Sequence, residues 1–214
     1  MQISTRGAQA SDAAFIAWVQ LAAGRGHCER GFFDLAFTAT GSELLDDIEA
    51  LVVAPALSFH HWSRFLIAEV DGQPAAALSG YEPAKTGDEE LLLAYGDAAK
   101  QRGWEEDFFA GMEPRIAPLL ECMTPTPEDH WVVEWVATLP EYRGRGLVAG
   151  LLQEMLERGR GLDYKAAQIS IMIGNDAAQR AYESAGFTVV DEKTSPQLDD
   201  LLGTPGFRRL RQTI

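Results

Sequence analysis

The sequence predicts one α/β domain with a mixed sheet flanked by helices. Strand-like runs alternate with segments of helical periodicity from residue 131 onward, as in sheets covered by helices. A chain of 214 residues is long enough for one domain with a substantial core, but short for two independent enzymes. Hydrophobic residues make up 46% of the chain and charged residues 23%, which is ordinary globular composition. We therefore expect residues 1–214 to form a single domain.

The N-terminal part predicts strands at 2–6, 64–70 and 74–81 and helices at 12–23 and 42–53. In the first helix, Phe15, Val19 and Ala22 recur at helical spacing, and Pro55 stops the second helix. Asp71 and Gly72 separate two apolar runs. Because this dipeptide tolerates the positive φ of tight turns, it predicts a hairpin.

Residues 82–129 are richer in proline than the rest of the chain. Two helices are expected here, at 88–101 and 104–112, surrounded by prolines at 83, 114, 118, 125 and 127. We interpret this region as a helical insertion or a long helical connection. After it, strands are expected at 131–138, 166–173, 187–191 and 207–212, with helices at 145–158 and 175–185.

Charge and cysteine content exclude several classes of partner. A formal charge of −14 argues against nucleic-acid binding, which depends on Lys and Arg displacing phosphate counterions. Cys28 and Cys122 cannot form a disulfide framework, and with the four histidines they show no metal-ligand spacing, so we expect no metal and a cytoplasmic location. The apolar run at 13–24 is too short to span a bilayer, and no membrane association is expected.

The most informative stretch, residues 131–156, reads WVVEWVATLPEYRGRGLVAGLLQEML. A strand leads through a loop with Gly144 and Gly146 into an apolar helix. Glycine lets the backbone approach a phosphate, and the first turn of a helix offers N–H groups and a favourable dipole. Arg143 and Arg145 add positive charge. The loop therefore suits an anion, although the glycines are also ordinary turn residues.

Two other phosphate loops fit less well. A Walker A loop needs Lys and then Ser or Thr after its last glycine, but Leu147 and Val148 follow Gly146. A dinucleotide loop tolerates Ala149 at its third glycine position. However, the acidic residue that should follow at the end of a second strand is missing. Dinucleotide binding remains an alternative.

Two segments together resemble the GCN5-related N-acetyltransferase (GNAT) family. Residues 143–148, RGRGLV, match its R/Q-x-x-G-x-G/A signature at Arg143 and Gly146, with Val148 in the last place. Residues 173–187, IGNDAAQRAYESAGF, look like the family's exit from the fifth strand and the following helix. The resemblance covers residues 131–191 well. It implies a mostly antiparallel central sheet, with 82–129 as an insertion between the third and fourth strands.

The resemblance also implies a site for acetyl-CoA. The pyrophosphate would lie on the loop and helix start formed by Arg143, Gly144, Arg145, Gly146, Leu147, Val148 and Ala149. Backbone groups of Val136, Ala137 and Thr138 would pair with the pantetheine arm and direct an N–H at the thioester carbonyl. The apolar character of those three residues is equally what any buried strand shows.

Asn175 and Tyr182 lie seven positions apart, about two helical turns, and so share one side of their helix. By resemblance, Asn175 binds the pantetheine arm and Tyr182 protonates the departing thiolate. Without the family, Asn175 reads as a helix cap and Tyr182 as a core residue.

Glu134 interrupts an apolar strand. Alternation places it on the face of Val132 and Val136, opposite Trp135. A carboxylate in mid-strand suggests a hydrated cleft or an ion pair. Family members often carry a general base near this position, and the place on the fifth strand where some have a catalytic Glu is Ser170 here. Glu134 is therefore the candidate base.

Together these features predict acetyl transfer from acetyl-CoA to a primary amine, small molecule or peptide, in a ternary complex. Neither cysteine lies in the resembling motifs, so no covalent enzyme intermediate is expected. The histidines at 60, 61 and 130 remain substitute bases. A noncatalytic acyl-CoA sensor or interaction domain is the alternative function, and a homodimer is left open.

Overall fold

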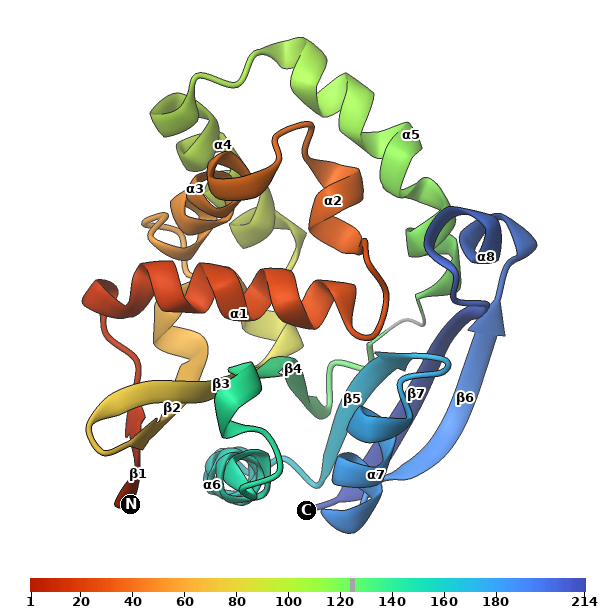
Figure 1. Cartoon of the computed structure of the whole chain (residues 1–214). Helices are drawn as coiled ribbons and strands as arrows, with labels where there is room; N and C mark the ends of the chain where they lie inside the picture. The colour runs from red at the N-terminus through yellow and green to blue at the C-terminus, as the bar shows by residue number, and fades with distance from the viewer. Residues whose placement is uncertain (124–125) are drawn as a thin grey trace.

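A seven-stranded sheet forms the centre of the computed structural model, which describes residues 1–123 and 126–214 (Figure 1). The strand order is β1-β2-β3-β4-β5-β7-β6. The strands are β1 Ile3–Gly7, β2 Phe65–Val70, β3 Gln73–Tyr81, β4 His130–Thr138, β5 Ala166–Met172, β6 Thr188–Thr194 and β7 Gly206–Thr213. Neighbouring strands are antiparallel except for β4 and β5, which are parallel. The predicted mixed, mostly antiparallel sheet is confirmed.

Helices cover both faces of this sheet. In the described part of the chain they are α1 Ala13–Arg25, α2 Phe32–Ala36, α3 Gly41–Val52, α4 Asp88–Arg102, α5 Glu106–Cys122, α6 Leu147–Gly161, α7 Asp176–Ser184 and α8 Pro196–Leu202. In Figure 1, α1 to α5 lie on one side of the sheet and α6 on the other. Among the described residues, none of these helices is both long and apolar enough to cross a membrane.

Two hydrophobic cores follow from this layering. The first lies under α1 to α5 and α8 and includes Ile16 of α1 and Ile48 of α3, both fully buried. The second lies between the sheet and helices α6 and α7 and includes Leu151, Leu152 and Tyr182. A Cβ on Gly80 of β3 would collide with Met155 of α6, so glycine there permits the close packing of α6 on the sheet.

The predicted hairpin is present. β2 and β3 pair antiparallel around Asp71 and Gly72, whose φ angles are +50° and +79°. Two successive positive φ values are those of a tight turn whose twist matches the flanking strands. The Asp-Gly pattern therefore predicted this hairpin for the correct physical reason.

The helix expected at 104–112 is longer than predicted, because α5 continues through Pro114 and Pro118 to Cys122. Proline removes a backbone hydrogen bond and disfavours a helix interior. Here Ile116, Leu119 and Cys122, at helical spacing, are buried in the first core and offset that cost. Pro125 lies outside the described residues. The short helices α2 and α8 were not predicted.

Candidate active site

β4 and β5 separate after a short stretch of pairing. The ladder joins three residue pairs, His130 with Ala166, Trp131 with Ala167 and Val132 with Gln168. Beyond them the described residues of the two strands form no further ladder pair. A cavity of about 1340 Å³ opens between the diverging strands and is lined by the β4 residues Val136, Ala137 and Thr138 and by the β5 residues Ser170, Ile171 and Met172.

A bulge in β4 determines which side chains enter this cavity. The register between β3 and β4 shifts next to Trp135, whose φ is +50°, a value unusual for a bulky residue. Trp135 packs against Phe33 on the α1 side of the sheet, while Val136 packs on the α6 side. The sequence-based alternation was therefore wrong beyond Glu134, at Trp135 and Val136. Glu134 shares a face with Trp135 and not with Val136, because the bulge interrupts the alternation.

The glycine loop leads directly into α6. Gly144 and Gly146 have φ angles of +74° and +75°, which L-residues with a Cβ rarely adopt. No heavy atom lies within 4 Å of a Cβ built on either glycine, so the space in front of the loop is open. Helix α6 begins at Leu147 with Gly146 as its N-cap, and no side chain caps it. Its first-turn N–H groups and its dipole suit an anion.

Two guanidinium groups accompany the loop. Arg143 donates from Nε to the Thr138 carbonyl at 3.3 Å, and Arg145 donates from Nη2 to the Glu141 carbonyl at 3.0 Å. The Arg145 guanidinium also lies 5.2 Å from the centroid of the Tyr142 ring. Both side chains are exposed, and every residue from 143 to 149 lines the cavity. The loop therefore offers backbone donors and positive charge to one ligand position.

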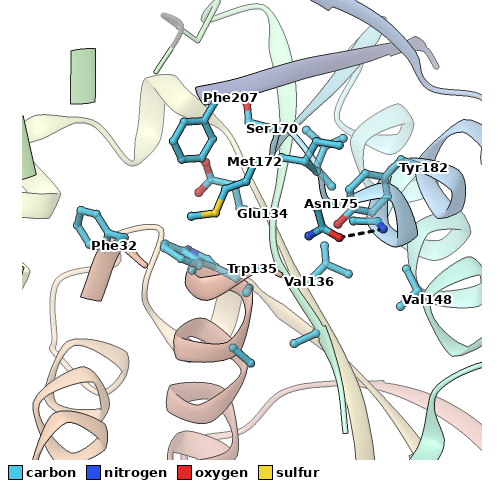
Figure 2. A pocket seen from close by; sticks show the side chains of 18 of the residues that line it. Phe32, Glu134, Trp135, Val136, Val148, Ser170, Met172, Asn175, Tyr182 and Phe207 are labelled. Atoms are coloured by element: carbon cyan, nitrogen blue, oxygen red, sulfur yellow. Dashed lines mark hydrogen bonds between the residues drawn. The ribbon is translucent and has the colours of Figure 1, made fainter. Parts of the chain in front are cut away.

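Asn175 and Tyr182 face the same cavity from α7 (Figure 2). The Asn175 side-chain oxygen accepts a hydrogen bond from the Ala178 N–H at 3.3 Å, so Asn175 is the N-cap of α7 as well as a cavity residue. Tyr182 is 5% exposed and packs at 6.4 Å from the Phe187 ring. Burial raises the pKa of the Tyr182 phenol above its usual value of 10.0, so the hydroxyl stays protonated at neutral pH.

Glu134 lies between two parts of the cavity. In Figure 2 its carboxylate has Phe32 and Trp135 on one side and Asn175 and Tyr182 on the other. The Tyr81 hydroxyl of β3 interacts with this carboxylate, a partner that the sequence did not single out. Burial raises the pKa of Glu134 to about 7, and the Tyr81 hydroxyl opposes the shift. A carboxyl group with a pKa near neutrality suits proton transfer.

The substitute histidines do not reach the cavity. His60 is fully buried, its Nδ1 lies 2.7 Å from the Gln20 side-chain oxygen, and burial lowers its pKa to about 3. The described residues that line the cavity include neither His60 nor His61 nor His130. They do include His27, which follows α1 and which no sequence pattern marked. Ser170 of β5 is exposed in the gap between the strands, as a cavity residue.

A family model describes this arrangement of strand, glycine loop and helix. The model of the acetyltransferase (GNAT) family matches residues 37–187. The chain belongs to this family. A search of curated protein sequences found no match.

Solved GNAT structures share the fold over nearly the whole chain. An N-acetyltransferase from Staphylococcus aureus Mu50 is 23% identical, with a TM-score of 0.68 and coverage of 97% of this chain and 99% of that one. The protein yncA from Salmonella typhimurium, solved with its cofactor acetyl-CoA, is 18% identical, with a TM-score of 0.54 and coverage of 99% of this chain and 93% of that one. A polyamine N-acetyltransferase from Drosophila melanogaster, which forms N-acetylagmatine, is 13% identical, with a TM-score of 0.55 and full coverage of both chains.

Proposed function

We propose that this GNAT protein transfers an acetyl group from acetyl-CoA to a primary amine in a ternary complex. One observation carries the proposal. A single cavity connects the uncapped start of α6 with Glu134 and Tyr182, which suit a base and an acid at neutral pH. The solved structure of yncA with acetyl-CoA supports the choice of acyl donor.

The donor-binding half of the cavity fits a CoA diphosphate. The open space in front of Gly144 and Gly146 admits a phosphate close to the backbone, and Arg143 and Arg145 add charge at the cavity mouth. The gap between β4 and β5 accommodates an extended pantetheine arm beside residues 136–138, with Asn175 opposite. In this position acetyl-CoA supplies an activated acyl group, and the protein supplies orientation and proton transfer.

Proton transfer is assigned to two side chains. Glu134, directly or through water, takes the proton that the amine gives up as its nitrogen bonds to the acyl carbon. The Tyr182 hydroxyl donates a proton to the sulfur as the C–S bond breaks. The Tyr81 hydroxyl positions the Glu134 carboxylate. The products that leave are the amide and free CoA, whose sulfur carries the proton from Tyr182.

Steady-state kinetics test this proposal. CoA release would be followed with acetyl-CoA and a panel of primary amines, and initial rates would be measured at several concentrations of each substrate. We expect intersecting lines in double-reciprocal plots, which indicate a ternary complex. Parallel lines would indicate a covalent acyl-enzyme and contradict the mechanism. Acetyl-CoA binding without turnover on any amine would favour the noncatalytic acyl-CoA sensor.

A cytoplasmic location, expected from two free thiols, remains part of the proposal.

A further inference from the structure

The part of the cavity beyond Glu134, away from the glycine loop, has a wall of aromatic rings. These rings belong to Phe32, Phe59, Tyr81, Tyr95, Phe109 and Trp135. Several are in contact: the ring centroids of Phe59 and Tyr81 are 5.6 Å apart, and those of Tyr95 and Phe109 are 6.4 Å apart. Such rings present large apolar surfaces and a face that attracts cations. We call this part the acceptor chamber.

Helix α5 extends the same wall with aliphatic side chains. Met112, Ile116 and Leu119 recur at helical spacing and all line the cavity. Arg115 fixes α5 to α2, since its Nε and Nη2 donate to the carbonyls of Leu35 and Ala36 at 2.8 and 2.7 Å. The apolar wall is thus held in place by hydrogen bonds on the side of α5 that packs on α2.

Negative charge in the chamber is limited to one group. The chain has 32 acidic residues, yet Glu134 is the single acidic side chain among the described residues that line the cavity. The acidic first turns of α4 and α5, which hold Asp88 and Glu106 among others, do not contribute to the lining. One carboxylate can partner one ammonium group, and a second cation buried without a partner is costly.

We infer that the acceptor is a primary monoamine carrying a bulky aromatic or alkyl group. This inference rests on the proposed function, because it names the substrate class of the same site. The amine would lie beside Glu134 and Trp135, and the apolar group would fill the space between the rings and α5. Burying that group contributes about 25 cal/mol for each Å² of apolar surface removed from water. A polyamine acceptor, as in the Drosophila relative, would need further carboxylates in this chamber.

Matched amine pairs test the inference. 2-Phenylethylamine and 4-(2-aminoethyl)piperidine have the same number of heavy atoms, as do n-hexylamine and 1,5-diaminopentane. The diamine of each pair carries a second cation, and the first pair also differs in the aromaticity of its ring, so the second pair controls for that difference. We expect kcat/KM for CoA release to be about 10-fold or more higher for the monoamine in each pair. Equal or higher values for the diamines would overturn the inference and leave the proposed function intact. Calorimetric binding of 2-phenylethylamine to the CoA-saturated protein without any turnover would contradict the proposed function but support the chamber.

Three variants locate the effect in the chamber. Met112→Glu adds a carboxylate to the wall, and Ala110→Glu adds the same charge to an exposed position of α5 that does not line the cavity. We expect Met112→Glu to lower kcat/KM for 2-phenylethylamine about 10-fold. The ratio of kcat/KM for 2-phenylethylamine to that for 4-(2-aminoethyl)piperidine should also fall. Ala110→Glu should show neither change. Phe109→Ala, which adds no charge, should raise KM for 2-phenylethylamine more than KM for ethylamine. The assignment would be overturned if Phe109→Ala raised KM equally for 2-phenylethylamine and ethylamine. It would also be overturned if Met112→Glu and Ala110→Glu changed kcat/KM equally.

Discussion

The hydroxyl of Tyr81 on β3 interacts with the carboxylate of Glu134 on the neighbouring strand β4, and each group shifts the pKa of the other. Burial raises the pKa of Glu134 to about 7, and the Tyr81 hydroxyl acts more weakly in the opposite direction. Burial and, to a smaller extent, the neighbouring Glu134 carboxylate raise the pKa of Tyr81, so its phenol stays protonated. The protonation state of Glu134 therefore depends on its burial and on a hydroxyl from the adjacent strand.

The pH dependence of the reaction follows from this pair. As the proposed base, Glu134 can accept a proton only when it is ionised, so kcat/KM should rise as pH increases through about 7. Above that range, ionisation of Glu134 should cause no further increase in kcat/KM. Tyr81→Phe removes the hydroxyl that favours the ionised form of Glu134, so the rise in kcat/KM should move to higher pH. Initial rates of the two proteins across the pH range measure this shift. An unmoved profile in Tyr81→Phe would remove Tyr81 from its positioning role.

Glu134→Gln should separate catalysis from stability. Turnover should fall on the order of 10²- to 10⁴-fold, the usual contribution of a general base. At alkaline pH the same substitution should increase the stability of the folded protein. The pKa of Glu134 is higher in the folded protein than its ordinary value of 4.5. Protonated Glu134 therefore makes its whole contribution to the free energy of unfolding below about pH 4.5, and this contribution is lost as pH rises through about 7.

Thermal unfolding at several pH values measures this effect. Glu134→Gln should have a higher Tm than the unmodified protein at pH 8, and the difference should vanish near pH 4. Glu113→Gln, which removes an exposed charge from α5, is the control and should show little change at either pH. A lower Tm for Glu134→Gln at pH 8 would show that the ionised carboxylate is well stabilised where it lies.

Tyr182→Phe tests the proposed acid. The ring remains and keeps its packing against Phe187, but the donor is lost. We expect turnover to fall on the order of 10²- to 10³-fold, with little change in the Kd for acetyl-CoA. Single-turnover kinetics and calorimetry together separate these two quantities. Unchanged turnover would leave Tyr182 as a core residue of the second hydrophobic cluster.

Gly146 tests the diphosphate position. Gly146→Glu places a side chain and a negative charge in the open space before α6, and it forces an L-residue to a φ of +75°, so acetyl-CoA binding should be lost. Gly150→Ala is the matched control, since it lies inside α6 and a Cβ there meets no atom within 4 Å. That variant should bind normally and gain about 0.5–1 kcal/mol of stability. Calorimetric titration of both variants makes the comparison.

The loop and its flanking elements were predictable because their signals are local. Gly144 and Gly146 adopt positive φ angles, and Asp71 and Gly72 form the predicted turn, since few residue types tolerate these conformations. Most strand and helix positions also followed from hydrophobic periodicity. The helix α5 was cut short in the prediction because proline is a local signal against helices, whereas the packing of its buried face is a tertiary effect.

Parts of the site could not be predicted from local patterns. The bulge at Trp135 reverses the alternation of β4, and no residue type there signals it, because Trp rarely has a positive φ. Tyr81 lies 53 positions before Glu134, so their contact depends on the pairing of β3 with β4. The acceptor chamber is assembled from α2, β3, α4, α5 and β4, which are distant in sequence. Such contacts require the folded sheet.

A crystal structure with acetyl-CoA would test the central claim most directly. The account predicts that the diphosphate lies against the backbone of residues 143–149 and that the thioester lies in the gap between β4 and β5, with its sulfur in reach of the Tyr182 hydroxyl. A loop left empty at saturating acetyl-CoA, or a donor bound elsewhere on the protein, would contradict it.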